Sequence, residues 1–128
     1  MKRNKALPVL TKAEEEIMQI IWQLGRCLVR DILDHLGDPD MPHSTVSSVV
    51  RILEKKGFVD HKAYGKTYEY FPLVNKEDYA QHGVKSLVEK YFGGSPKMLV
   101  SFLVQSEDMN LRELNELMKT LDKSNKTR

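Results

Sequence analysis

The feature that most constrains the fold of this chain is a change of hydrophobic period at Gly57. Before this glycine, apolar residues recur at the i, i+3, i+4 and i+7 spacing that gives a helix one buried stripe. After it, the pattern alternates with a period of two, which is typical of strands. The apolar stripe consists of Val46, Val49, Val50 and Leu53, with Ile52 beside them. The sequence therefore predicts an amphipathic helix over residues 45–56 that leads directly into a β hairpin.

The opposite face of this helix carries short hydroxyl groups and long cationic side chains. These residues are Ser44, Thr45, Ser47, Ser48, Arg51 and Lys55. Lys55 and Lys56 lie in the last turn, where cations interact favourably with the helix dipole, and Gly57 stands where a glycine C-cap is expected. The outer face of the helix is therefore small, polar and basic.

The hairpin is predicted from two strand-like runs, residues 58–63 and residues 67–71, with residues 64–66 as the turn. Pro72 ends the second strand because a proline nitrogen cannot donate to a β ladder. The turn and the first strand each carry a lysine, so the hairpin is cationic.

Two further helices are predicted before this helix and hairpin. Thr11 and Glu14 form a capping box that opens the first helix. The second covers residues 29–36, where a new apolar stripe runs up to Gly37. The short segment between the two helices, residues 26–28, is expected to pair as a brief third strand beside the hairpin.

The order of these elements is helix, helix, turn, helix and hairpin, which is the order of a winged helix-turn-helix. In that fold the third helix is the recognition helix and the hairpin is the wing. Residues 1–74 are therefore predicted to be a DNA-binding winged-helix domain, in a chain that is mainly α-helical with one small β hairpin.

The distribution of charge favours the same function, although the net charge of the chain is only +2. Residues 1–12 carry a net charge of +4 and residues 41–74 carry +2, whereas residues 13–40 carry −5. Contact with phosphate requires a local basic patch of this kind rather than a basic chain. The alternative is that these are ordinary charges scattered over a solvated surface.

The remainder of the chain, residues 75–128, is predicted to be entirely helical. Capping signals at Asn75, Ser95 and Asn110 open three helices, of which the middle one has almost no polar face. A helix that is apolar all round must be buried, and three short helices cannot bury it by themselves. We therefore expect a homodimerisation module; the alternative is a monomer in which these helices fold back on the winged helix. The predicted interface residues are Leu87, Tyr91, Leu99, Phe102, Leu103, Leu114, Leu117 and Leu121.

No arrangement of residues indicates an enzyme, a cofactor or a metal site. The four histidines lack the paired spacing of metal ligands. The single cysteine, Cys27, lies in an apolar stretch and is expected to be a buried structural thiol. One cysteine cannot form an internal disulfide, and no signal peptide or membrane span is recognised, so a cytoplasmic protein is expected.

Groove geometry assigns roles to the outer face of the helix and to the hairpin. A recognition helix presents its first two turns to base edges, so its hydroxyls are expected to reach bases or phosphates. Arg51 lies one turn further and is expected to pair with guanine or phosphate, and the lysines of the wing with phosphates. Of Tyr68 and Tyr70, one is expected in the core and one near the DNA backbone. The predicted DNA-binding residues are Ser44, Thr45, Ser47, Ser48, Arg51, Lys55, Lys62 and Lys66.

Three segments together resemble the BlaI/MecI/CopY family of bacterial penicillinase repressors. They are LTKAEEEIMQIIW at residues 10–22, STV at residues 44–46 and LEKKGFVDHK at residues 53–62. The resemblance covers nearly the whole chain. It implies a homodimeric transcriptional repressor on a pseudo-palindromic DNA operator, with the C-terminal helices spacing the two winged helices.

The resemblance also implies how repression ends. In the BlaI/MecI branch, a membrane-bound antibiotic-sensing metalloprotease triggers cleavage inside the dimerisation module. The stretch that resembles the cleaved segment is residues 100–103, with Ser101 before Phe102 where the family has asparagine before phenylalanine. The cysteine cluster of the copper-responsive branch has no counterpart after Cys27.

The alternative function is a winged helix that serves only as a protein-interaction module.

Overall fold

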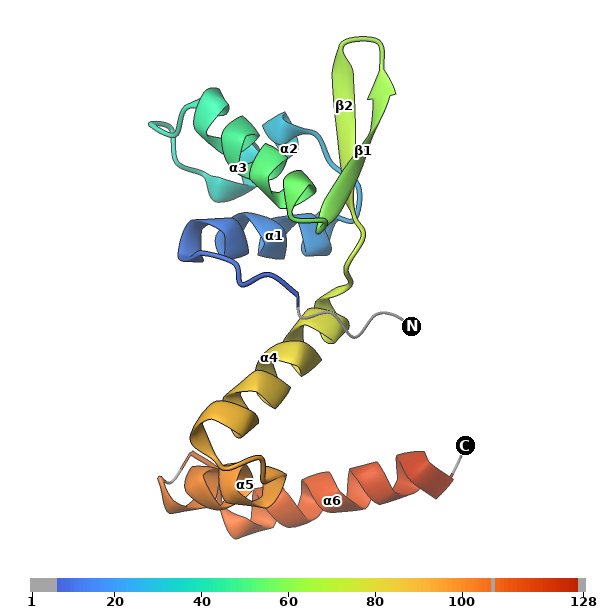
Figure 1. Ribbon diagram of the computed structural model, residues 1–128. Helices are drawn as coiled ribbons and strands as arrows, with labels where there is room; N and C mark the ends of the chain where they lie inside the picture. The colour runs from blue at the N-terminus through green and yellow to red at the C-terminus, as the bar shows by residue number, and fades with distance from the viewer. Residues whose placement is uncertain (1–6, 107, 127–128) are drawn as a thin grey trace. The chain divides into compact units, whose positions relative to one another are not determined.

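The computed structural model describes residues 7–106 and 108–126, which divide into two compact units between His82 and Gly83 (Figure 1). We call them the N-terminal unit and the C-terminal unit. The N-terminal unit contains three helices and a two-stranded antiparallel sheet, and the helical remainder of the chain completes a mainly α fold. The helices are α1 (Lys12–Leu24), α2 (Val29–Leu36), α3 (His43–Lys55), α4 (Lys76–Tyr91), α5 (Pro96–Gln105) and α6 (Leu111–Lys126), and the strands are β1 (Val59–Tyr64) and β2 (Thr67–Pro72).

Helix α1 begins with the predicted capping box. The Thr11 hydroxyl accepts a hydrogen bond from the Glu14 amide at 3.2 Å, and Glu14 Oε1 accepts one from the Thr11 amide at 3.0 Å. These two bonds satisfy amide groups that a helix start otherwise leaves without partners. Helix α2 ends at Gly37 as expected.

The predicted third strand is a single bridge. Cys27 and Tyr70 exchange two backbone hydrogen bonds, Cys27 N to Tyr70 O at 3.0 Å and Tyr70 N to Cys27 O at 2.7 Å. This bridge joins the segment between α1 and α2 to the wing. It also fixes the side of β2 that faces the helices, since successive residues of a strand point to opposite faces.

Helix α3 extends two residues further toward its N-terminus than predicted. It begins at His43 after Pro42, whose φ of −70° suits the entry to a helix. At the other end the C-cap is Lys56 rather than Gly57, and Gly57 follows it with a φ of 87°. This left-handed conformation favours glycine, so Gly57 turns the chain from the helix into β1.

The wing is a tight hairpin in which Val59 pairs with Pro72 and Tyr64 with Thr67. The predicted three-residue turn was too long: Tyr64 belongs to β1, and the turn consists of Gly65 and Lys66. A two-residue turn requires a positive φ, and Gly65 supplies it at 65°. The added pair extends the ladder by one residue at its tip.

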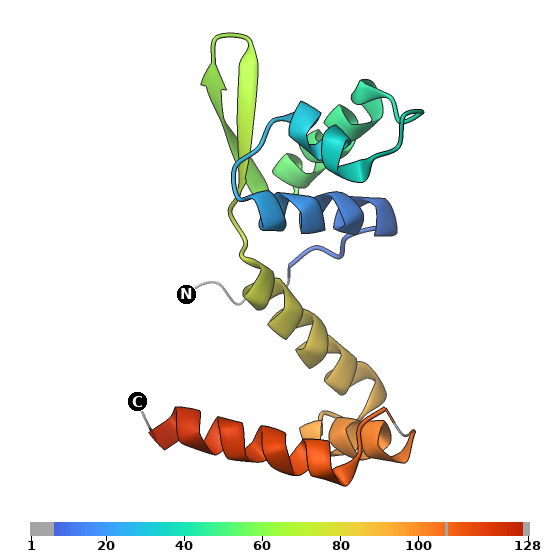
Figure 2. The same ribbon diagram turned by 180° about the vertical axis from the view of Figure 1, so that it is seen from behind.

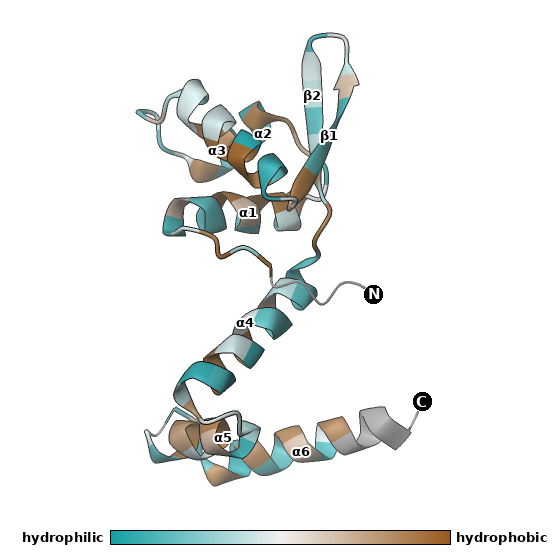
Figure 3. Ribbon diagram, viewed as in Figure 1, coloured by the Kyte–Doolittle hydropathy of each residue, from teal (hydrophilic) through white to brown (hydrophobic). Residues whose placement is uncertain are grey.

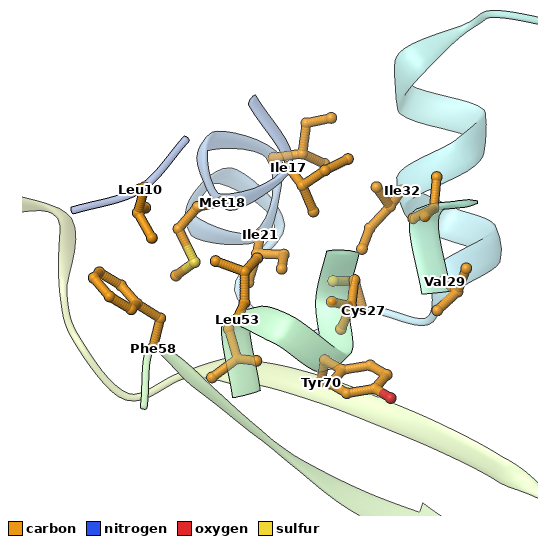
Figure 4. Packing of buried hydrophobic residues seen from close by; sticks show 14 residues of the cluster. Leu10, Ile17, Met18, Ile21, Cys27, Val29, Ile32, Leu53, Phe58 and Tyr70 are labelled. Carbon is orange, nitrogen blue, oxygen red and sulfur yellow. The ribbon is translucent and has the colours of Figure 1, made fainter. Parts of the chain in front are cut away.

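The hydrophobic core of the N-terminal unit lies where the three helices meet the base of the wing (Figure 4). It includes Tyr70, which is 4% exposed, whereas Tyr68 is 47% exposed. Tyr70 is therefore the tyrosine in the core, and a contact of Tyr68 with the DNA backbone stays a prediction. The core residues are Leu10, Ile17, Met18, Ile20, Ile21, Cys27, Val29, Ile32, Val46, Val50, Leu53, Phe58, Val59 and Tyr70.

The start of α4 is held against this core. The Trp22 indole donates a 2.8 Å hydrogen bond to the Val74 carbonyl, and the Tyr79 hydroxyl accepts one from the Leu10 amide at 3.3 Å. The Tyr79 ring packs edge-on against Phe58 with the ring centroids 5.4 Å apart. The first turn of α4 is therefore part of the N-terminal unit.

The C-terminal unit contains the rest of α4 together with α5 and α6 (Figure 2). Ser95 caps α5 and Asn110 caps α6, as predicted. Helix α6 reaches Lys126, and residues 127–128 lie outside the described residues. Most residues of α5 are hydrophobic (Figure 3). None of the helices in the described part of the chain has the length and apolar composition needed to cross a membrane.

Candidate nucleic-acid interface

The outer face of α3 is open to solvent. Ser44, Thr45 and Ser48 are exposed, and Ser47 is half-buried. The opposite face is closed because Val46, Val50 and Leu53 are buried in the core, while Val49 packs at its edge. Helical periodicity therefore places the hydroxyl groups outside once the apolar stripe has packed.

A groove of about 570 Å³ lies between the start of α2, α3 and the wing. Its walls bring together residues from three parts of the sequence. The polar residues that line it include Arg30, His43, Ser47, Arg51, Lys66 and Tyr68. No acidic side chain is among the described residues of its lining. The groove is therefore a positively charged concavity beside the exposed face of α3.

The predicted DNA-binding residues fall into two groups around this groove. Ser47, Arg51 and Lys66 line it. The others lie elsewhere on the same elements, exposed and outside its lining. They are Ser44, Thr45, Ser48 and Lys55 on α3 and Lys62 on β1. Lys62 Nζ is 5.5 Å from the centroid of the Tyr64 ring, so its ammonium is drawn over an aromatic face.

Arg30 is a candidate that the sequence patterns did not single out. It is the second residue of α2 and is exposed. Its position in sequence, between Val29 and Asp31 in an acidic region, gave no basic pattern. Only the packing of α2 against α3 carries it to the groove wall, where Arg51 and Lys66 also lie.

Two other cations of the N-terminal unit, Lys56 and Arg26, have acidic partners. Lys56 Nζ is 2.6 Å from Glu14 Oε1 and also donates to the Val9 carbonyl at 3.2 Å. This hydrogen bond from Lys56 holds the pKa of the buried Glu14 carboxyl below its usual value. Arg26 pairs with Glu69 at 3.3 Å. These cations connect elements of the fold.

His61 connects the wing to α3. Its Nδ1 lies 2.8 Å from Glu54 Oε2, and its ring stacks on Tyr68 with the centroids 4.2 Å apart. The structure half-buries His61 between the recognition helix and the wing, where it supports the angle between the two.

Three possible metal-ligating groups gather at the same place. Ligand atoms of Glu54, Asp60 and His61 lie within 4.8 Å of one another. Each already has a partner in the chain: Glu54 bonds His61, and Asp60 accepts a hydrogen bond from the His61 amide at 2.8 Å. These bonds account for the cluster, so we assign no metal ion to it.

Two buried ionisable groups lie behind the interface. Burial raises the pKa of the Cys27 thiol to about 11, with Asp31 and Glu69 adding to the shift. A thiol with such a pKa is a poor nucleophile at neutral pH. Burial also raises the pKa of the Tyr70 phenol. Both groups are uncharged parts of the core.

The C-terminal unit exposes most of the residues predicted for the dimer interface. Tyr91 is 73% exposed, Phe102 is 52% exposed, and Leu87, Leu117 and Leu121 are also exposed. The remaining three, Leu99, Leu103 and Leu114, are half-buried. Within the chain the ring of Phe102 is 5.5 Å from that of Phe92. Ser101, at the predicted cleavage position, is exposed on α5.

The fold and this surface define a winged helix-turn-helix protein. The family model described as penicillinase repressor matches residues 10–123. The methicillin resistance regulatory protein MecI of Staphylococcus aureus (strain N315) is 30% identical over 115 residues, which are 89% of this chain and 94% of that protein. The chain therefore belongs to the penicillinase repressor family, a family of transcriptional repressors and not of enzymes.

Two further comparisons agree. The penicillinase repressor of Bacillus licheniformis is 24% identical over 119 residues, covering 92% of this chain and 93% of that protein. The solution structure of the DNA-binding domain of the repressor BlaI aligns with a TM-score of 0.50 and 26% identity, covering 59% of this chain and 93% of that domain. The BlaI/MecI resemblance and the winged-helix fold are confirmed.

Proposed function

We propose that this chain represses transcription by binding operator DNA as a homodimer, and that proteolytic cleavage in α5 ends repression. The observation that carries the DNA-binding part is the juxtaposition of the exposed hydroxyl face of α3 with a groove lined by Arg30, Arg51 and Lys66 and by no described acid. Family membership supports the same function.

Helix α3 is the proposed reader of the major groove. Its first two turns present Ser44, Thr45, Ser47 and Ser48, whose small side chains allow the helix to approach base edges. Single hydroxyls discriminate bases less strongly than bidentate arginine contacts do. Much of the affinity should therefore come from phosphates, through Arg51, Lys55, Lys62 and Lys66.

The C-terminal unit is the proposed dimerisation module. Helix α5 has no buried residue in the single chain although seven of its ten residues are apolar. Exposed apolar side chains on α4, α5 and α6 need a partner to cover them, because soluble monomers seldom expose apolar patches beyond a few hundred Å². A second copy of this chain supplies a surface of the same composition.

Cleavage between Ser101 and Phe102 would split α5 in its middle. The cut would separate Phe102 and Leu103 from α4, and with them the part of the interface that α5 provides. A dimer gains affinity by tethering two DNA-binding units, so a protein that cannot dimerise leaves its operator. We propose a membrane-bound sensor metalloprotease as the partner that initiates this step.

The test of DNA binding is fluorescence anisotropy of the protein with its own promoter DNA across a salt series. We expect selective binding, two chains per site, and a steep fall in affinity with salt from several phosphate contacts. Lys66→Ala should weaken binding, and Lys85→Ala, a matched change at an exposed position of α4, should not. Equal weak binding to any duplex, or none, would favour the protein-interaction alternative.

The test of release is mass spectrometry of the repressor recovered from induced and uninduced cells. The proposal expects an N-terminal fragment that ends at Ser101 in induced cells only. Loss of operator binding should accompany the appearance of this fragment. An intact chain in cells whose promoter has been derepressed would contradict the proteolytic step and leave the DNA-binding proposal unaffected.

A further inference from the structure

We propose that the groove between α2, α3 and the wing binds a phosphodiester group of the DNA backbone, and that Arg30 is a contact for it together with Arg51 and Lys66. This inference rests on the proposed function and deepens it. It adds α2 to the DNA-binding surface, which the sequence patterns confined to the recognition helix and the wing.

The cations of this region differ in whether they have acidic partners. Among the described residues, the ion pairs of this region use Arg26, Lys56 and His61. Arg30, Arg51 and Lys66 are absent from these pairs and share the wall of one groove. Three like charges gathered in one concavity repel one another, and an anion bound between them removes that repulsion.

The acids nearest to Arg30 in sequence lie away from the groove. Asp31 and Asp34 are close to Arg30 in sequence, but they line a separate hollow with Leu24 and Arg26. One side of α2 thus carries carboxylates, and the other presents Arg30 to the groove. The acidic character of residues 13–40 does not extend to the groove wall.

The groove matches a phosphodiester group in its hydrogen-bond donors and its charge. Such a group offers oxygen acceptors and one negative charge, and guanidinium and ammonium groups are the donors that bind it most strongly. Ser47 and Tyr68 add hydroxyl donors, and His43 adds a ring nitrogen. The groove has a volume of about 570 Å³, which leaves room for a phosphate group.

The consequence is a fixed position of α3 relative to the DNA strand. Phosphate contacts set the register and orientation of a protein on the duplex, whereas base contacts read the sequence. Arg30 and Lys66 come from the two elements that flank α3, so a phosphate held between them would position the helix from both sides. Arg30 is by this argument a positioning contact and not a base reader.

The experiment compares the full-length wild type with Arg30→Ala, Arg30→Lys and Arg112→Ala in anisotropy titrations over a salt series. The probes are the promoter duplex, variants with single base-pair changes, and a random duplex. Arg112 is exposed on α6 and gives the same side-chain loss away from the groove. Thermal unfolding followed by circular dichroism checks that every variant is folded.

Loss of one phosphate contact lowers the slope of log K against log salt by about 0.9, which is about an eightfold loss of affinity at 0.1 M salt. We expect this loss for Arg30→Ala on every duplex, partial recovery with Arg30→Lys, and none for Arg112→Ala. An unchanged slope, or a loss confined to one base-pair position, would overturn the site. A wild type that binds no duplex would instead overturn the proposed function, and this inference with it.

Discussion

The two compact units contain similar amounts of helix but differ in what their helices bury. In the N-terminal unit, fourteen residues form one core, and Phe58, Ile21 and Leu53 in it are 0% exposed. Among the described residues of the C-terminal unit, Val88 is the one apolar side chain that is buried. The first unit contains its own core, whereas the second has apolar helices without one.

The difference shows that helix content and independent stability are separate properties. Helices form from local signals such as the caps at Ser95 and Asn110. In proteins, however, most helical stability comes from packing an apolar face. The free energy of unfolding of the N-terminal unit should therefore be independent of protein concentration. The stability of the C-terminal unit should instead rise with protein concentration, because its partner chain stabilises it.

The largest expected effect is the loss of the core side chain Phe58. Phe58→Ala should destabilise the N-terminal unit by about 3–5 kcal/mol, because it leaves a cavity beside Tyr79. Urea denaturation followed by tryptophan fluorescence measures this through Trp22, which packs against Tyr79. Phe102→Ala is the matched control and should leave this transition unchanged. An equal loss of unfolding free energy in the two variants would refute the contrast between the units.

The second effect concerns the C-terminal unit and the dimer. Phe102→Ala should weaken dimerisation by about 2–3 kcal/mol, since half-exposed aromatic residues of this kind are typical interface anchors. Sedimentation velocity at several protein concentrations gives the dissociation constant. Ser101→Ala, on the same helix and exposed, is the control. A wild type that is monomeric at every concentration would contradict the proposed dimer.

The third effect is a pH-dependent contribution from Glu14. Glu14→Gln should destabilise the N-terminal unit by about 1.5 kcal/mol at neutral pH, because Lys56 loses a charged hydrogen-bond partner. The pKa of Glu14 is lowered on folding, so its contribution is present above the unfolded value of 4.5 and is lost as pH falls through the folded pKa. The difference in free energy of unfolding between wild type and variant, measured by urea denaturation, should therefore shrink below pH 4.5. Glu15→Gln, exposed on the same helix, should show neither effect.

The smallest effect on stability is expected at the contact between the wing and α3. His61→Ala removes the bond to Glu54 and the stacking on Tyr68, and should cost at most about 1 kcal/mol because both groups are partly exposed. The same substitution should weaken DNA binding by more than it lowers the free energy of unfolding, because a wing held less firmly positions Lys66 less well. Anisotropy and urea denaturation measured side by side separate the two, with His35→Ala as control. Unchanged DNA affinity would remove His61 from the interface.

The sequence by itself determined the elements of this protein and their order. The capping box of Thr11 and Glu14, the apolar stripe from Val46 to Leu53 and the change of period at Gly57 are local patterns, and the structure reproduces each within two residues. Local signals succeed here because caps and periodicity depend on residues a few positions apart. The boundary errors at His43 and Tyr64 lie where the helix or the strand continues beyond its first or last recognisable signal.

The tertiary structure alone decided which polar side chains work together. Lys55 and Lys56 are adjacent and equivalent in sequence, yet Lys56 is bound to Glu14 while Lys55 is exposed. Tyr70 enters the core and Tyr68 does not, because the bridge to Cys27 sets the facing of β2. Arg30 reaches the groove of Arg51 and Lys66 only through the packing of α2 on α3. These outcomes depend on contacts between residues far apart in the chain, and no short-range pattern encodes them.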